Sequence, residues 1–510
     1  MAFGTVLSAM IDGIRVEMVQ VEADMSNGLP MFHMVGYLSA EVKEAGERVR
    51  TALKNSGFEN PVKKMIINLS PATIKKRGSS YDLPIAVAIM VSSGLIPQKN
   101  VQNKVFIGEL SLDGKVQRVN GLLPIVMAAK EAGVGAFVVP EGNAKECALV
   151  TGVHIYGVGT LKGVYDLLLG EREKHPYQNL KEDNETEKCT LDFSDIYGQK
   201  AVKRAVEIAV GGGHNILLLG PPGSGKSMIA KRIPTILPPL SLKESLEITK
   251  IYSIRGLLNE KHPLIYQPPF RSVHHTTTKS ALLGGGSIPA VGEITLANYG
   301  VLYMDELAEF RREMIEVLRQ PLEEKKIQIT RKSGSYQYPA DFMLVASMNP
   351  CPCGMYPDLE RCHCSPKQIL HYIEKISQPF LDRLDICVEA PRLAFEELGQ
   401  SKVPEEEVLE SSAQIRARIE EVREIQKRRY GKRSGDLTVK EIETHCVLDK
   451  ESQFVMEQVY QRLHLTVRSY HKVLKVARTI ADFEKSESIL SKHLCEAIGY
   501  RGADKKSWGR

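Results

Sequence analysis

The pattern of apolar and polar residues divides the 510-residue chain into four parts. Residues 1–172 alternate strand-like and helical apolar runs, which predicts an α+β domain. Residues 173–190 are mostly polar, with little apolar surface to offset the entropy of ordering, and we interpret them as a linker. Over 191–392, apolar strand, glycine-rich turn and helix repeat, which is typical of a mostly parallel α/β sheet. Helical periodicity and charge dominate 393–510 and predict a helical domain.

The most apolar segment of the chain is Leu83–Ile96. It contains Pro84 and Gly94 and is too short to span a bilayer, so it predicts a buried core helix. The first residues do not resemble a secretory signal, because Asp12 interrupts the first apolar stretch and no positive region precedes it. We therefore expect a cytoplasmic protein that has no membrane partner.

Shorter patterns predict individual elements. Asp113-Gly114 separates two strand-like runs, and because both residues tolerate a positive φ, we expect a hairpin there. Ser39 precedes a helical pattern over 41–55 and is suited to cap its N-terminus. Arginine and lysine crowd the stretch 416–433, which we interpret as a solvated helix face.

Composition and charge narrow the picture only a little. The chain has 67 basic and 62 acidic residues, for a net charge of +5. This balance permits a nucleic-acid partner without requiring one, because a local basic patch matters more than the total. Hydrophobic content of 43% is ordinary for globular protein.

A phosphate-binding motif follows the apolar run 215–219. The run suits a buried strand and a helix-compatible stretch comes after the motif, which is the context that a G-x-x-x-x-G-K-[ST] match requires. Glycines let backbone N–H groups surround phosphate oxygens, the lysine reaches the β and γ phosphates, and the last hydroxyl binds Mg²⁺. The nucleotide-binding residues are Gly220, Pro221, Pro222, Gly223, Ser224, Gly225, Lys226 and Ser227.

A second strand-like run, 300–304, ends in Asp305-Glu306. With a phosphate loop upstream, Asp305 is expected to hold Mg²⁺ through water, beside Ser227. Glu306 is expected to act as the general base on the water that attacks ATP. A solvated turn is the alternative interpretation of this acidic pair.

Several motifs carry a resemblance that covers essentially the whole chain. The sequence resembles the magnesium-chelatase-like AAA+ ATPases and, within them, the YifB/ComM competence-protein family. The motifs include Asp195-Ile-Tyr-Gly-Gln199, Phe270-Arg-Ser-Val-His-His275, Gly300 to Phe310, Ser347-Met-Asn-Pro-Cys-Pro-Cys-Gly354, Pro379-Phe-Leu-Asp-Arg-Leu-Asp385 and Val467-Arg-Ser-Tyr-His471.

The resemblance implies an AAA+ P-loop ATPase core and a helical lid, with roles for further residues. Gln199 lies in the segment that shapes the adenine pocket. Asn349 corresponds to sensor 1, which orients the attacking water, and otherwise is a turn residue before Pro350. Arg383 corresponds to the arginine finger that reaches a neighbouring subunit's γ-phosphate, and otherwise forms a surface ion pair with Asp382 or Asp385. Arg468 corresponds to sensor 2, acting on its own or a neighbour's nucleotide. A finger acting on a neighbour requires an assembly, and the family implies a hexameric ring.

A basic hairpin is expected between the acidic pair and Asn349. Lys325-Lys326 and Arg331-Lys332 flank the strand-like run 327–330. The glycine-rich segment 280–293 resembles the helix-2 insertion of this AAA+ clade, which faces the pore. Basic pore loops suit a DNA backbone electrostatically, and an ordinary solvated hairpin is the alternative.

Four of the nine cysteines fall within residues 351–364. Two C-x-C pairs, separated by eight residues, have the ligands for a structural tetrahedral Zn²⁺ site. His363 is an alternative ligand, and unligated reduced thiols are the other interpretation. The ligands would be Cys351, Cys353, Cys362 and Cys364.

Residues 106–119 resemble a stretch of the Lon protease domain, so the resemblance implies a Lon-like fold for the N-terminal domain. Lon proteases use a Ser–Lys dyad. No lysine stands near Leu122–Pro124, and Asp82 stands near the position expected for the serine. We therefore expect a proteolytically inert domain.

The resemblance as a whole implies an ATP-hydrolysing, Mg²⁺-dependent motor. Its most specific form is a hexameric DNA translocase that drives branch migration in recombination or natural transformation. The alternatives are an ATP-dependent Lon-like protease, which Ser79 or Ser80 would serve, and a metal-insertion chaperone of the magnesium-chelatase type.

Overall fold

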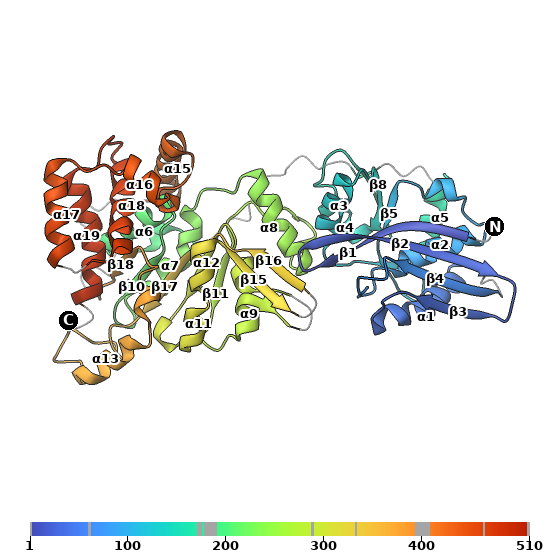
Figure 1. Ribbon diagram of the computed structural model, residues 1–510, viewed down its shortest axis with the longest axis horizontal. Coiled ribbons are helices and arrows are strands. Elements are labelled where there is room, and N and C mark those ends of the chain that lie inside the picture. Colours follow the sequence, from blue (N-terminus) through green and yellow to red (C-terminus); the bar gives the residue numbers. More distant parts are fainter. Residues whose placement is uncertain are drawn as a thin grey trace. The chain divides into compact units, whose positions relative to one another are not determined.

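The computed structural model describes most of the chain and divides it into two compact units (Figure 1). Unit 1 comprises Met1–Asn184, Leu242–Ile265 and Ser287–Val291, and unit 2 comprises Glu185–Ser241, Tyr266–Gly286 and Gly292–Arg510. The described residues are 3–59, 63–170, 176–177, 191–286, 290–331, 334–392, 409–462 and 465–506, with side chains to 501. The expected linker 173–190 lies outside them except for 176–177, as do Lys332 and the start of the expected helical domain.

Unit 1 is built on a seven-stranded mixed sheet of order β3-β4-β2-β1-β5-β8-β9. The pairs β1–β2 and β2–β4 are antiparallel and the other pairs are parallel. Alternate residues of β4 are buried, as its period-two pattern of apolar side chains requires. The strands are β1 (Phe3–Asp12), β2 (Arg15–Ser26), β3 (Met31–Val35), β4 (Lys64–Ser70), β5 (Lys104–Phe106), β8 (Ala136–Pro140) and β9 (His154–Val158).

Helices and a small hairpin complete unit 1. Helix α2 is buried along its whole length, which confirms the core helix expected over 83–96. The hairpin β6–β7 turns at Gly114 with φ of +83°, as its turn residues predict. These elements are α1 (Ala40–Asn55), α2 (Asp82–Ser92), β6 (Glu109–Leu110), β7 (Val116–Gln117), α3 (Leu122–Glu131), α4 (Glu141–Cys147) and α5 (Leu161–Leu169).

One helix of unit 1 comes from the middle of the sequence. Helix α8 (Leu242–Ile254) follows the phosphate-loop helix along the chain but packs against α3. The amide of Gly121 donates to Ser253 O at 3.0 Å, and the Ser253 hydroxyl donates to Glu146 Oε2 at 3.2 Å. Two segments of the expected continuous core over 191–392 therefore belong to unit 1, the longer of them Leu242–Ile265. Helical periodicity alone does not predict this difference.

Unit 2 contains a five-stranded sheet of order β11-β14-β17-β10-β18 in which every pair is parallel. Its strands are short apolar runs because a parallel sheet is covered on both faces. Met304 pairs with Ala346 and Leu219 with Met348, so the carboxyl ends of β14, β17 and β10 meet at one edge. The strands are β11 (Phe270–Val273), β14 (Val301–Met304), β17 (Met343–Met348), β10 (Ile216–Leu219) and β18 (Ile386–Glu389).

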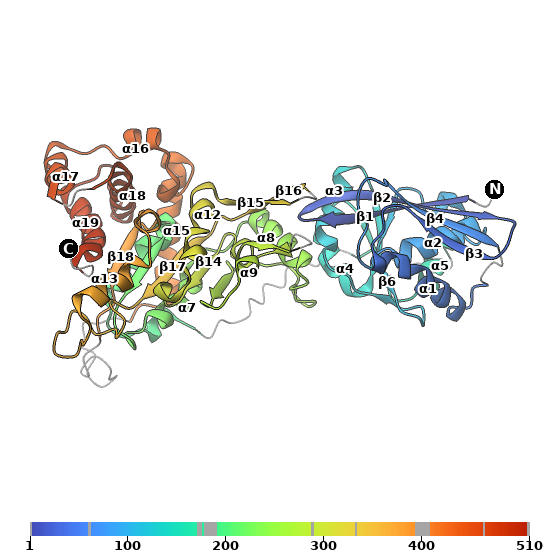
Figure 2. The ribbon, with the colours of Figure 1, turned by 60° about the horizontal axis from the view of Figure 1, so that its bottom comes forward.

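Helices surround this sheet. Helices α15 and α18 pack against α6, and α19 packs against β18. Figure 2 shows α16 to α19 grouped together within unit 2. The main helices are α6 (Lys200–Gly212), α7 (Lys226–Ile236), α15 (Ser412–Tyr430), α16 (Val439–His445), α17 (Lys450–Arg462), α18 (Val467–Phe483) and α19 (Ser491–Lys506).

Short elements connect the larger ones. The expected basic hairpin is present as β15 (Lys326–Arg331) and β16 (Gly334–Pro339). No helix in the described part of the chain has the length and apolarity to cross a membrane. The other short elements are α9 (Lys279–Leu283), β12 (Gly284–Gly285), β13 (Ala290–Val291), α10 (Glu293–Leu296), α11 (Arg312–Glu316), α12 (Arg319–Glu324), α13 (Pro366–Glu374) and α14 (Gln378–Leu381).

The arginine-rich helix α15 is only in part the solvated face that its composition suggests, since Lys427 and Arg428 are exposed but three of its arginines contact the core. Arg416 donates to a backbone carbonyl of α7 at 3.0 Å. Arg418 pairs with a carboxylate of α6 at 2.7 Å, and Arg423 donates to a carbonyl of α6 at 2.9 Å. These side chains tie α15 to the core of unit 2, so the sequence interpretation is wrong for them.

Candidate nucleotide site

The phosphate loop connects the end of β10 to the start of α7, as expected. Gly223 and Gly225 have φ of +79° and +86°, in the left-handed region that side chains disfavour. Gly220 is required for another reason, because a Cβ there would lie 2.2 Å from the Ala390 carbonyl oxygen. The loop's shape therefore depends on glycine at three positions.

Lys226 is folded over this loop. Its Nζ donates to the carbonyl oxygens of Gly220 at 2.6 Å and Pro221 at 2.8 Å, and to Asn349 Oδ1 at 3.3 Å. Burial lowers the pKa of Lys226, although the nearby carboxylates of Asp305 and Glu306 raise it in part. A buried ammonium group held by uncharged oxygens gains from a phosphate as its counter-ion.

Asp305 lies at the end of β14, beside the start of α7. The Ser227 hydroxyl donates to Asp305 Oδ2 at 3.0 Å, and the Ser347 hydroxyl donates to Asp305 Oδ1. Burial raises the pKa of Asp305, but hydrogen bonds from Ser347, Tyr303 and Ser227 outweigh it, so the pKa lies below the usual value. The carboxylate is thus ionised and next to Ser227, an oxygen pair that suits Mg²⁺.

Glu306 adopts a backbone conformation that is rare for its residue type. Its φ is +52°, and its amide donates to Asp305 Oδ1 at 3.1 Å and to Ser347 Oγ at 3.4 Å. Such a conformation costs roughly 1–3 kcal/mol. This conformation turns the chain sharply after β14. The carboxylate of Asp305 therefore lies beside Ser227, whereas that of Glu306 is exposed to water.

Gln199 lies immediately before α6, also with a positive φ of 55°. Its Nε2 donates to Ser224 O at 3.2 Å and to Pro391 O at 2.7 Å, so it joins the phosphate loop to the chain after β18. Within the described residues, the buried Oε1 of Gln199 and the buried Oγ of Ser224 have no hydrogen-bond partner. Unsatisfied buried polar atoms at a glycine-rich loop fit a polar ligand such as a nucleotide.

The two arginines expected from the resemblance lie together at a second place in unit 2. Arg383 follows α14, its side chain is only 8% exposed, and its Nη2 is 3.0 Å from Glu323 Oε1. Arg468, in the first turn of α18, contacts the same oxygen of Glu323. The ion pair that Arg383 forms is with Glu323 of α12, whose side chain is 38% exposed, whereas Asp385 pairs with Lys472 at 2.8 Å.

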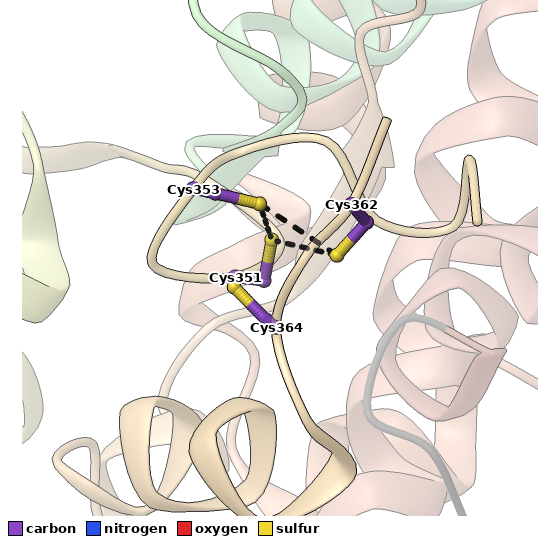
Figure 3. Close-up of side chains that lie close together, drawn as sticks. All are labelled: Cys351, Cys353, Cys362 and Cys364. Carbon is purple, nitrogen blue, oxygen red and sulfur yellow. Dashed lines mark hydrogen bonds between the residues drawn. The ribbon is translucent and has the colours of Figure 1, made fainter. Parts of the chain in front are cut away.

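The four cysteines of 351–364 also come together, in the loop between β17 and α13 (Figure 3). Three sulfur–sulfur distances are 3.3, 3.6 and 3.8 Å, and all four sulfur atoms lie within 4.8 Å of one another. His363, the alternative ligand, is not part of this group.

Sequence reasoning missed three residues of these sites. Ser347 and Tyr303 hydrogen-bond each other at 3.3 Å and support Asp305. Both residues lie in apolar runs that the sequence already marked as strands, so their polar side chains near the strand ends could have identified them. Glu323 had no such signal, because it is one of several charged residues before the hairpin.

Comparisons with known proteins agree over most of the chain. Family models match three regions: "Magnesium chelatase, subunit ChlI" at 192–398, "Subunit ChlI of Mg-chelatase" at 21–143, and "Magnesium chelatase, subunit ChlI C-terminal" at 409–501. Competence protein ComM of Haemophilus influenzae is 41% identical over 98% of both chains. The uncharacterized protein YifB of Salmonella typhimurium is 40% identical over 97% of this chain and 96% of its own. A magnesium-chelatase 38 kDa subunit of Cereibacter sphaeroides is 25% identical over 34% of this chain and 56% of its own.

Proposed function

The chain belongs to the YifB/ComM family of magnesium-chelatase-like proteins, and from this premise we propose that it is an AAA+ ATPase that moves DNA. The observation that carries the proposal is the meeting of three strand ends at one edge of a parallel sheet. Lys226, Asp305 and Asn349 follow these strands and lie within hydrogen-bonding reach of one another or of Ser227. Ligands of parallel sheets bind at such edges.

The residues divide the chemistry among them. Backbone amides of 223–227 donate to the phosphates of ATP. Lys226 also binds the phosphates, for which its ammonium group leaves the carbonyl oxygens of Gly220 and Pro221. Ser227 and Asp305 would hold Mg²⁺, which neutralises charge that develops on the phosphates. Glu306 accepts the proton of the attacking water, and Asn349 orients that water. Gln199 borders the base of the nucleotide.

Arg383 and Arg468 supply positive charge from another part of unit 2. We propose that they complete the site of a neighbouring chain, which requires an assembly, and that this assembly is a homo-hexameric ring. A positive group that reaches the transferred phosphoryl group stabilises charge in the transition state.

The DNA track is supported by the hairpin and by a relative's name. Ile327 and Ile329 of β15 are buried, whereas Lys326 and Arg331 are exposed and available to a phosphate backbone. Lys325 is different, since it pairs with Asp341 at 3.2 Å and with Asp436. The relative described as competence protein ComM supports a role in transformation or recombination.

The Lon-like protease is less well supported. Asp82, near the expected serine position, is buried and bonded by two nitrogens of Arg48 at 2.8 and 2.9 Å. The Ser79 hydroxyl donates to the Glu109 carboxylate rather than to a lysine. A Ser–Lys dyad requires a lysine to activate the serine, and the partner of Ser79 is a carboxylate. This contact favours a proteolytically inert N-terminal unit.

ATP turnover with and without DNA tests the proposal. Single-stranded, duplex and four-way-junction DNA should stimulate hydrolysis by the full-length protein, and DNA binding should weaken steeply as salt rises. Glu306→Gln should retain ATP binding and lose about 10²-fold or more in turnover. Glu309→Gln, an exposed carboxylate three residues away, is the matched control and should keep full turnover.

Each part of the proposal can fail separately. Normal hydrolysis by Glu306→Gln would reject the assigned base. If no form of DNA changes ATP turnover and none binds in a salt-dependent way, the proposed action on DNA is rejected, whereas the proposed ATPase activity is not.

A further inference from the structure

We infer that Cys351, Cys353, Cys362 and Cys364 bind one Zn²⁺, and that this metal site holds one wall of the nucleotide site in place. The metal site stands on its own geometry. Its effect on ATP rests on the proposed function. Figure 3 shows the four side chains gathered within the loop, with the sulfur atoms of Cys351, Cys353 and Cys362 facing one another.

The sulfur geometry matches a tetrahedral metal site. Four thiolates bonded to Zn²⁺ at about 2.3 Å lie roughly 3.8 Å apart. The measured separations of 3.3, 3.6 and 3.8 Å are near that value. A disulfide would require about 2.05 Å.

The surroundings of the sulfur atoms also suit thiolate ligands. Backbone amides point at them, with Tyr356 N lying 3.4 Å from Cys351 Sγ and the Met355 amide hydrogen-bonded to Cys353. Such outer hydrogen bonds support metal ligands. Four protein thiolates leave no open coordination position, so the site is structural rather than catalytic.

The loop has turns closed by backbone hydrogen bonds, such as Cys362 N to Asp358 O at 2.8 Å, but few buried side chains to fix its shape. Residues 357–361 are all exposed, and Leu359 is 80% exposed. Cys351 and Gly354 are the buried residues of the stretch 351–364. A segment with so few buried apolar groups cannot offset the entropy of ordering, and a metal ion supplies the missing stabilisation.

This loop touches the nucleotide site at two points. Cys351 lies two residues after Asn349, whose side chain accepts a hydrogen bond from Lys226. A Cβ on Gly354 would lie 2.4 Å from Cδ and 2.8 Å from Cγ of Pro222, so the backbone at Gly354 rests directly on the phosphate loop. Metal binding thereby sets the position of Asn349 and supports the phosphate loop from outside.

The chain after the cluster returns to the same place. Ser365 caps α13 with a capping box, so the helix begins two residues after Cys364. Tyr372 of α13 forms a hydrogen bond with the backbone of Asn349. The loop is thus held at both ends against the residue that corresponds to sensor 1.

Metal analysis of the purified full-length protein tests the site. Mass spectrometry of the elements should find about one zinc per chain. Cys362→Ser and Cys364→Ser should each reduce the zinc content at least tenfold. Cys495→Ser, which removes an exposed cysteine outside the cluster, should leave it unchanged. Co²⁺ in place of zinc should show sulfur-to-metal charge-transfer absorption. A zinc-free protein with four reactive thiols, or with disulfides among these cysteines, would overturn the site.

Gly354→Ala tests the link to the nucleotide site while keeping all four thiols. The added methyl group meets Pro222, so zinc should remain and ATP turnover should fall, by roughly 10²-fold if the loop shifts by about 1 Å. Gly431→Ala is the matched control, because Gly431 also has a positive φ but a Cβ there meets nothing within 4 Å. Its turnover should stay near the wild-type value.

The two proposals separate cleanly. Wild-type protein that hydrolyses ATP without zinc refutes the metal site and leaves the ATPase. Zinc in a protein that never hydrolyses ATP refutes the ATPase and leaves the metal site. Normal turnover by Gly354→Ala, with zinc bound and the fold intact by circular dichroism, refutes the link between them.

Discussion

A single residue, Glu323, forms ion pairs with both Arg383 and Arg468. One carboxylate between two guanidinium groups fixes their positions and offsets their mutual repulsion. Glu323→Gln keeps the shape but removes the charge, so the arginines should lose their common geometry. We expect ATP turnover to fall by about 10- to 100-fold while ATP affinity stays unchanged. Steady-state turnover and equilibrium nucleotide binding, measured side by side, check this.

The neighbouring residue is the control for Glu323. Glu324 lies on the same helix, is exposed and accepts a hydrogen bond from Gln320 at 3.1 Å. Glu324→Gln should leave turnover near the wild-type value. Equal losses in both variants, or a loss of affinity in Glu323→Gln, would contradict a role through the arginines.

The residues that sequence could predict share a simple physical signal. Lys226, Asp305 and Asn349 each follow an apolar run short enough for a buried parallel strand, and such strands end at one edge. Glu323 gives no signal of this kind, because its role depends on two arginines distant in sequence. The charge of a residue does not by itself predict which oppositely charged residue will lie next to it in the folded chain.

Among the elements, the hairpin β15–β16 carries the DNA proposal. Replacing Lys326 and Arg331 by alanine should remove two phosphate contacts and reduce the slope of log affinity against log salt by roughly 0.9 for each, since counterions are released per contact. Fluorescence anisotropy of labelled duplex over a salt series measures this slope. Gln328→Ala, which changes an exposed uncharged residue of the same strand, should leave the slope unchanged.

An unchanged slope in the double variant would remove the hairpin from the DNA contact. Other basic groups would then have to carry it. Lys325 is a poor substitute, because its ion pairs with Asp341 and Asp436 already occupy it.

Element types were more predictable than the surfaces the elements cover. Apolar runs and turn residues located α2, the hairpin at Gly114 and the strands before the phosphate loop and the acidic pair. Periodicity shows which face of a helix is apolar but not what covers that face. For this reason α8 was expected in the ATPase core and is found against α3. Likewise, the arginines of α15 were expected to face solvent, and Arg416 and Arg423 bond to α7 and α6.

At the scale of the whole molecule, the chain passes between its two units more than once. Segment Leu242–Ile265 leaves unit 2 after α7 and returns before β11, and it folds as part of unit 1. Ile248 and Ile251 of α8 are buried. Unit 1 therefore includes a segment that follows the phosphate-loop helix in the sequence. Cleavage at the linker alone would not divide the chain into the two units.

Truncation tests this dependence. A chain lacking residues 1–184 has lost α3, against which α8 packs, and should therefore expose apolar surface of α8, at about 1.5–3 kcal/mol for each isoleucine that is uncovered. We expect this variant to aggregate in size-exclusion chromatography. Ile248→Gln with Ile251→Gln should restore a soluble species in the truncated chain. The same pair in the full-length chain should lower the melting temperature, because it buries polar groups in unit 1. A truncated chain that is soluble and monodisperse without these changes would show that α8 does not need unit 1 to cover it.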